Sequence, residues 1–158
     1  MEPGRDLRRP AQVAPEMSVR GRVPRTFLDT NVLVYSDDPR YPAKRATALD
    51  LLRRHLRSRT GVVSLQVLQE YFVSATGKLK LDSELARQRV AVFANFHVAE
   101  LTVGDILAAI DLHRLHCLSL WDTLILRCAK QAGCRVLLSE DMQHGRIVDG
   151  VEIVNPFL

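Results

Sequence analysis

The chain has 158 residues, of which 47% are hydrophobic and 25% are charged, and its formal net charge is +4. This composition is typical of a globular protein, and the length suits one domain with a sizeable core. No apolar run reaches the roughly 18 residues of a membrane span, and the N-terminus has no apolar signal segment, so we expect a cytoplasmic protein without membrane association.

The positive charge is concentrated in two segments. Residues 1–25 contain six arginines and three acidic residues. Their prolines and weak apolar periodicity predict that residues 1–24 form a disordered basic leader, and Met17 is an alternative start of the protein. Residues 40–59 contain seven basic residues and one acid, Asp50. That segment is a candidate for binding phosphate backbones, although a solvated helix face is the simpler interpretation.

From residue 25 onward, short apolar strands alternate with helical segments. We expect strands at 26–28, 62–63, 97–101 and 135–139, and a closing strand or hairpin at 146–154. The periodicity and turn residues predict helices over 30–35, 42–58, 64–75, 82–95, 102–115 and 119–132. This alternation predicts one α/β domain over residues 25–158, a sandwich with a mostly parallel central sheet flanked by helices.

Two of the expected helices begin with the same pattern. Thr102-Val-Gly-Asp105 and Ser119-Leu-Trp-Asp122 both have the form of a capping box, with Asp in place of the usual Glu. Taken alone, Asp122 is therefore better explained as a capping acid than as a functional residue. Glu70, taken alone, is likewise better explained as an acid on a helix surface.

Four acidic residues nevertheless lie where expected elements begin or end: Asp29, Glu70, Asp122 and Asp141. Asp29 directly follows the first strand, and Asp141 follows the fourth strand after one residue. Ligands of parallel α/β sheets bind at the carboxyl ends of the strands, and the helices that follow strands start at that edge. We therefore expect the four acids to converge on one cleft, with Glu140 as a competitor of Asp141.

Such a group of carboxylates predicts a metal site. Closely packed carboxylates raise one another's pKa, and a bound cation removes that penalty. Oxygen ligands in this number favour Mg²⁺, with Mn²⁺ as a substitute, over zinc. Two such ions about 4 Å apart are suited to phosphodiester hydrolysis, one activating water and the other stabilising the leaving oxygen.

Other chemistries have weaker support in the sequence. His113 and His116 are best explained by surface or core roles, and His144 is a minor candidate for the site. No serine stands in a nucleophile elbow, and no glycine-rich phosphate loop is present. The three cysteines are odd in number and lack a CxxC pair, so we interpret Cys117, Cys128 and Cys134 as reduced core thiols.

Residues 26–158 also resemble the PIN domain family and, within it, the VapC-type toxins of toxin–antitoxin systems. The resemblance rests on five segments: Phe27-Leu-Asp-Thr-Asn-Val32, Gln69-Glu70, Trp121-Asp122-Thr123, Leu138-Ser-Glu-Asp-Met142 and Asp149–Phe157. It implies that Asp29, Glu70, Asp122 and Asp141 are catalytic Mg²⁺ ligands. It also implies that Asn31 and Ser139 orient the site, with Glu140 as a further supporting residue.

The function that the resemblance implies is endoribonuclease cleavage of a tRNA or rRNA, which stops translation. The implied partners are an RNA substrate and an antitoxin protein, in a homodimer and a toxin–antitoxin hetero-oligomer. We expect the substrate phosphates to run along the basic helix at 40–59 and near Arg146. Two alternatives are a PIN nuclease that acts in RNA processing or on DNA, and an RNA-binding module without catalysis.

Overall fold

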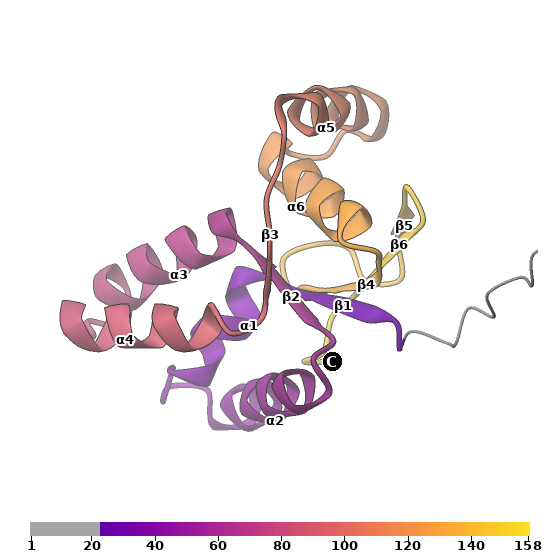
Figure 1. Ribbon diagram of the computed structural model, residues 1–158. Coiled ribbons are helices and arrows are strands. Elements are labelled where there is room, and N and C mark those ends of the chain that lie inside the picture. The colour runs from indigo at the N-terminus through magenta and orange to yellow at the C-terminus, as the bar shows by residue number, and fades with distance from the viewer. Residues whose placement is uncertain (1–22) are drawn as a thin grey trace, which may run out of the picture.

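The computed structural model describes residues 23–158 (Figure 1). Within this range the strands form one sheet in the order β3-β2-β1-β4-β6-β5. They are β1 (Arg25–Leu28), β2 (Gly61–Ser64), β3 (His97–Ala99), β4 (Cys134–Leu138), β5 (Ile147–Val148) and β6 (Val151–Val154). Every neighbouring pair is parallel except the terminal hairpin of β5 and β6. The expected mostly parallel α/β fold is therefore confirmed.

The helices agree with the expected ones to within about two residues at each end. They are α1 (Thr30–Ser36), α2 (Pro42–Ser58), α3 (Leu65–Gly77), α4 (Ser83–Phe93), α5 (Val103–His116) and α6 (Leu120–Gln131). Side chains of Asp29, Ser64, Asp82, Thr102 and Ser119 cap the N-termini of five of them. These caps satisfy backbone N–H groups that have no partner inside the helix, and so they fix where each helix begins.

Two helical layers enclose the sheet (Figure 1). Helix α6 packs against β4 and β2, and α5 lies on its outer side. Helices α1, α2 and α3 cover the opposite face, and α4 packs against α3. The central strands are buried on both faces, as their apolar sequences indicate, with Phe27, Val62 and Leu137 fully inaccessible to solvent.

Two further expectations concern the N-terminal leader and the cysteines. The predicted leader lies outside the described residues except for its last two. Within residues 23–158, no helix is both long and apolar enough to cross a bilayer. Cys128 and Cys134 are buried free thiols, and burial raises their pKa to about 11 and about 12. Cys117 is free but exposed at the end of α5, so its assignment to the core was wrong.

Candidate active site

The site forms at the switch point of the strand order, between β1 and β4. The chain adds β2 and β3 on one side of β1, and then returns to place β4 on the other side. Leu28 at the end of β1 is in register with Leu138 at the end of β4, and the Asp29 N–H donates to the Leu138 carbonyl at 3.0 Å. Ligands of open α/β sheets bind at such a switch point. The register thus places Asp29 beside the residues that follow β4.

Asp29 is a buried carboxylate, only 5% exposed, that caps α1. Its Oδ1 accepts a hydrogen bond from the Thr30 N–H at 2.7 Å, and its Oδ2 accepts one from the Ser139 hydroxyl at 2.7 Å. Burial raises its pKa to about 6. The two hydrogen bonds oppose this rise, whereas the negative charges of Asp141 and Glu70 add to it. The ionised form of Asp29 therefore lacks a compensating positive charge.

Asn31 joins the ends of β1 and β4 through its side-chain amide. Its Nδ2 lies 3.1 Å from an oxygen of Asp141, 3.3 Å from the Ser139 hydroxyl and 3.4 Å from Asp29 Oδ2. Its Oδ1 accepts a hydrogen bond from the Glu140 N–H at 3.3 Å. The amide thus orients two carboxylates from different strands without neutralising either of them. Asn31 and Ser139, expected to orient the site, are thus both hydrogen-bonded to Asp29.

Glu70 approaches the same place from α3. Its Oε2 accepts a hydrogen bond from the Thr30 hydroxyl at 2.7 Å, and its Oε1 accepts one from Gln66 at 2.8 Å. Glu70 and Asp141 both line an open cleft of about 700 Å³, and Asp29 lies beneath it. Thr30 was not singled out from the sequence, although its position between Asp29 and Asn31 was the available signal.

The structure separates the roles of the neighbours Glu140 and Asp141. Glu140 binds the Lys44 ammonium and the Tyr35 hydroxyl at one wall of the cleft. Burial raises the pKa of Glu140, but the hydrogen bonds from Lys44 and Tyr35 outweigh this effect and hold the pKa below its usual value. Asp141, which shares Asn31 with Asp29, is therefore the acid that faces the cluster.

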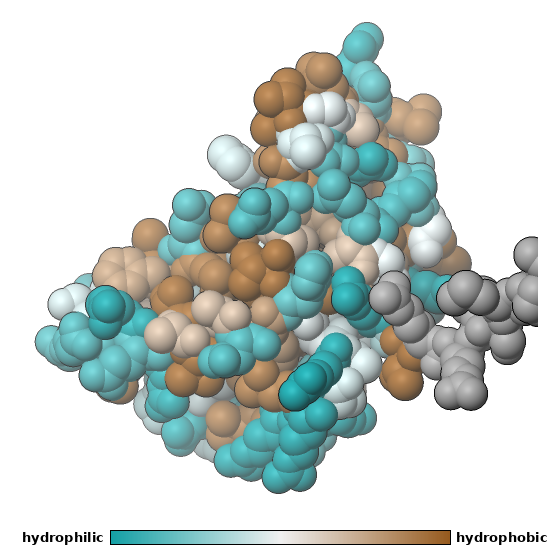
Figure 2. Space-filling model, in the orientation of Figure 1, coloured by the Kyte–Doolittle hydropathy of each residue, from teal (hydrophilic) through white to brown (hydrophobic). Residues whose placement is uncertain are grey.

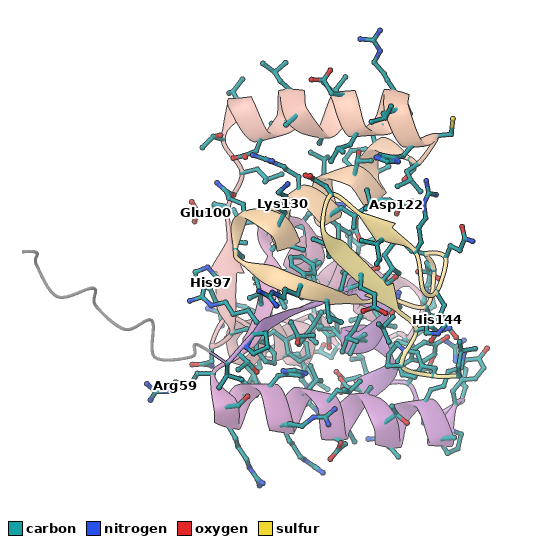
Figure 3. The ribbon with its side chains drawn as sticks, turned by 90° about the vertical axis from the view of Figure 1, so that its right-hand side faces the viewer. Arg59, His97, Glu100, Asp122, Lys130 and His144 are labelled. Carbon is teal, nitrogen blue, oxygen red and sulfur yellow. The ribbon has the colours of Figure 1, made fainter. Side chains whose placement is uncertain are left out.

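Asp122 shares no hydrogen-bond partner with the other three acids within residues 23–158. It is the third residue of α6, and its N–H donates to the Ser119 hydroxyl at 3.1 Å. Its carboxylate accepts no hydrogen bond from residues 23–158, so the capping box expected there is only half formed. Figure 3 shows Asp122 and His144 on one side of the molecule and Arg59 on the opposite side. Hydrogen bonds through Thr30 and Asn31 thus connect three of the four acids, whereas the Asp122 carboxylate has no hydrogen-bond partner within residues 23–158.

The histidines take the simpler roles expected for them. His144 Nδ1 accepts a hydrogen bond from the Asn155 N–H at 3.1 Å, and no contact joins it to the acids within residues 23–158. His113 binds the Leu118 carbonyl, and the His116 carbonyl accepts a hydrogen bond from Arg146 at 3.0 Å. Arg146, expected near the substrate, therefore has a structural partner.

The acids fit a divalent cation by their chemistry. Within residues 23–158, no three Asp, Glu, His or Cys side chains already stand at metal-binding spacing. Hydrogen bonds from Thr30 and Asn31 occupy oxygens of Glu70 and Asp141 that a cation would need. Turning these donors away would free a set of carboxylate oxygens around Asp29, whose pKa is raised by burial and, to a smaller extent, by the charges of Asp141 and Glu70. Hard oxygen donors of this kind suit Mg²⁺ or Mn²⁺.

Comparisons with known proteins agree with this fold. One chain of a toxin–antitoxin complex from Klebsiella pneumoniae superposes with a TM-score of 0.59 at 20% identity, over 83% of this chain and 97% of that chain. VapC20 of Mycobacterium tuberculosis, a toxin that cleaves the sarcin–ricin loop, superposes with a TM-score of 0.56 at 17% identity, over 73% and 91%. A comparison with curated proteins finds no match. The sequence profile of the PIN domain matches residues 26–149, most of the chain, and the protein therefore belongs to the PIN domain family.

Proposed function

We propose that this protein is a metal-dependent endoribonuclease, the VapC-type toxin of a toxin–antitoxin pair. The observation that carries the proposal is the cluster of Asp29, Glu70 and Asp141 at the switch point between β1 and β4. Membership of the PIN family and the fold shared with VapC20 support it. We propose a structured RNA of the tRNA or rRNA class as the substrate, and arrest of translation as the result.

The residues of the cleft would have different roles in phosphodiester hydrolysis. Mg²⁺ or Mn²⁺, held by Asp29, Glu70, Asp122 and Asp141, would lower the pKa of water and offset negative charge at the leaving oxygen. Ser139 and Asn31 fix the orientation of the Asp29 and Asp141 carboxylates. Supporting hydrogen bonds of this kind typically contribute 10–100-fold to metal affinity or activity.

The proposed reaction is an in-line attack of water on the scissile phosphate. The new bond joins the water oxygen to phosphorus, the bond to the 3′-oxygen breaks, and the leaving oxygen takes up a proton. The products are then a 5′-phosphate and a 3′-hydroxyl. A 2′,3′-cyclic phosphate product would contradict this route, because it requires attack by the ribose 2′-hydroxyl instead of water.

The central test compares two Asp→Asn changes of equal size and charge. Asp29→Asn should reduce RNA cleavage by more than about 100-fold, because it removes a ligand rather than a supporting residue. Asp50→Asn, at an exposed position of α2, should leave cleavage unchanged. Sequencing RNA 5′ ends after brief induction measures the cleavage and also identifies the substrate. Wild-type cleavage and growth inhibition by Asp29→Asn would rule out the site.

We also propose an antitoxin as the protein partner, a homodimer that joins antitoxins in a hetero-oligomer, and a cytoplasmic location. The toxin–antitoxin complex with a related fold and the free cysteines support these points. A small gene for a DNA-binding protein directly upstream should encode the antitoxin, and its co-expression should restore growth. RNA cleavage without growth arrest would instead favour a PIN nuclease of RNA processing.

A further inference from the structure

The basic helix α2 differs in charge between its two ends. Near the cleft, Arg40 pairs with Asp38 at 2.8 Å and Lys44 pairs with Glu140, whereas Arg45 donates a hydrogen bond to the Ser36 carbonyl at 3.2 Å. The other end carries exposed arginines that form no ion pair within residues 23–158; they are Arg53, Arg54, Arg57 and Arg59. Nitrogen-bearing side chains project from α2 into solvent (Figure 3). Most of the unpaired positive charge of this segment thus lies at the end away from the acids.

This charged end continues into a pocket of about 560 Å³, which Arg59 lines together with Arg25 and Arg135. Arg25 opens β1 and Arg135 lies in β4, so the two arginines come from adjacent parallel strands. Arg25 also donates to the Ala132 carbonyl at 3.2 Å, which fixes its position. Among residues 23–158, no acidic residue lines the pocket. Three arginines around one pocket, with no carboxylate among its described lining residues, create a site for anions.

The pocket and the cleft lie at opposite ends of the parallel strands, the pocket where β1 begins and the cleft where β1 ends. Arg25 precedes the buried part of β1, whereas Asp29 follows its end. Figure 3 shows Arg59 on the side opposite Asp122. Glu100 lies on the side of Arg59 but is not among the residues that line the pocket. Helix α2, at about 1.5 Å per residue, spans roughly 25 Å between these two ends.

We propose that this arginine surface binds the phosphate backbone of RNA away from the scissile bond. The surface consists of Arg25, Arg53, Arg54, Arg57, Arg59 and Arg135. The proposal rests on the proposed function for one point, that the bound polyanion is RNA. Arginine suits this role because its planar guanidinium donates two parallel hydrogen bonds to a phosphate and stays charged at any physiological pH.

The composition of the surface favours RNA over an acidic protein. Cores of protein interfaces are rich in aromatic and other apolar side chains. The part of the molecule formed by α2 is mostly hydrophilic (Figure 2). Among the residues that the structure describes, Val23 is the only exposed large hydrophobic residue that lines the pocket. An RNA that contacts both the pocket and the cleft must span roughly 25 Å, so the surface would favour long or folded RNA over short oligonucleotides.

The test measures RNA binding without turnover. The protein is full length with Asp29→Asn, in EDTA, so that residues 1–22 are common to all samples. The probe is a fluorescent 30-nucleotide single-stranded RNA of mixed sequence, titrated at several KCl concentrations. The test variant adds Arg59→Asn and Arg135→Gln; asparagine suits position 59 because the backbone there has a φ of 55°. The control instead adds Arg87→Gln and Arg114→Gln, which remove the same charge from α4 and α5.

The test variant should bind the RNA at least about tenfold more weakly at 100 mM KCl. Its plot of log affinity against log salt should be shallower by about 1.4, because each lost phosphate contact on a single strand contributes about 0.7. The control should keep both values near those of the parent protein. Equal affinity of the test variant and its parent, or an equal loss in the control, would overturn the proposal. Circular dichroism melting confirms that all samples are folded.

Cleavage assays separate this proposal from the proposed function. With Asp29 restored, the Arg59 and Arg135 changes should raise KM for long RNA and leave kcat for a four-nucleotide substrate unchanged. If wild-type protein cleaves RNA and the test variant binds RNA as tightly as its parent, only the arginine surface fails. If the arginines govern binding and no RNA is cleaved, only the proposed catalysis fails. Retained RNA binding with lost binding to an acidic protein would assign the surface to that protein and overturn the RNA proposal.

Discussion

Helices α5 and α6 begin with the same sequence pattern but use their aspartates differently. Thr102 and Asp105 at the start of α5 form a complete capping box, in which each side chain binds the backbone N–H of the other residue. At the start of α6, the Ser119 hydroxyl accepts a hydrogen bond from the Asp122 N–H. The carboxylate of Asp122 accepts no hydrogen bond from the Ser119 N–H in return. The carboxylate of Asp105 is thus part of a helix cap, whereas the carboxylate of Asp122 has no hydrogen-bond partner within residues 23–158.

The neighbours of each helix start explain the difference. Asp105 is buried against α6, where it accepts hydrogen bonds from Arg127 at 3.0 Å and Gln131 at 3.0 Å. Hydrogen bonds from Thr102, with a smaller contribution from Arg127, hold the pKa of Asp105 below its usual value. Asp122 is only partly buried, and within residues 23–158 its carboxylate accepts no hydrogen bond from an arginine or glutamine. A four-residue motif therefore predicts where a helix begins, whereas the surrounding helices decide whether its acid stays available for a ligand.

The largest expected effect is on catalysis. Asp122→Asn should lower RNA cleavage by more than about 100-fold if Asp122 is a metal ligand, and it should change the unfolding free energy by less than about 0.5 kcal/mol. Asp105→Asn should leave the cleavage rate per folded molecule within a factor of about three, since Asp105 has only structural partners. Single-turnover cleavage of the identified RNA measures both. Normal cleavage by Asp122→Asn would reduce the site to three acids.

The second expected effect is on stability, where Asp105→Asn should have a larger effect than Asp122→Asn. Asp105→Asn should lower the melting temperature by several degrees, more than Asp122→Asn does, because it weakens the capping box and the contact with Arg127. The pKa of Asp105 is lower in the folded protein than its ordinary value of 3.8. Its stabilisation is therefore present above about pH 4 and is lost as the pH falls through the folded pKa. The difference in melting temperature between the wild type and Asp105→Asn should therefore shrink as the pH falls below about 4.

Metal addition gives a readout that does not depend on catalysis. Mg²⁺ at 100-fold above its Kd should stabilise the wild-type protein by about 2.7 kcal/mol, and EDTA should reverse the effect. Asp105→Asn should keep this stabilisation, whereas Asp122→Asn should lose most of it. Thermal melts with and without Mg²⁺ test the comparison. Equal responses of the two variants would show that Asp122 does not hold the metal.

The smallest expected effect concerns the two cap hydroxyls. Ser119→Ala should cost about 1 kcal/mol of stability, because one N–H at the start of α6 loses its acceptor. Thr102→Ala should cost nearer 2 kcal/mol, because the Thr102 hydroxyl also donates to Asp105 at 2.7 Å. Urea unfolding at neutral pH measures both values. A larger cost for Ser119→Ala would mean that the start of α6 has structural contacts beyond its half-formed cap.

Much of the fold could be predicted because it depends on local patterns. The apolar runs of β1, β2 and β4 and the caps at Ser64 and Thr102 are sequence features, and the elements appear where these features place them. The strand order and the register of Leu28 with Leu138 are not local features. The choice between Glu140 and Asp141 depends on Lys44, which lies 96 residues earlier in the chain.

The α/β class, the helix starts and the positions of Asp29 and Asp141 just after strands follow from the sequence alone, because periodicity and capping act over a few residues. The tertiary structure decided that Asp29, Glu70 and Asp141 are connected through Asn31 and Thr30, while Asp122 shares no hydrogen-bond partner with them within residues 23–158. It also decided that Arg40 and Lys44 are ion-paired near the cleft, while the arginines at the far end of α2 form no ion pair within the same residues. Burial, pKa and ion pairing depend on groups brought together from distant parts of the chain, and only the folded chain specifies them.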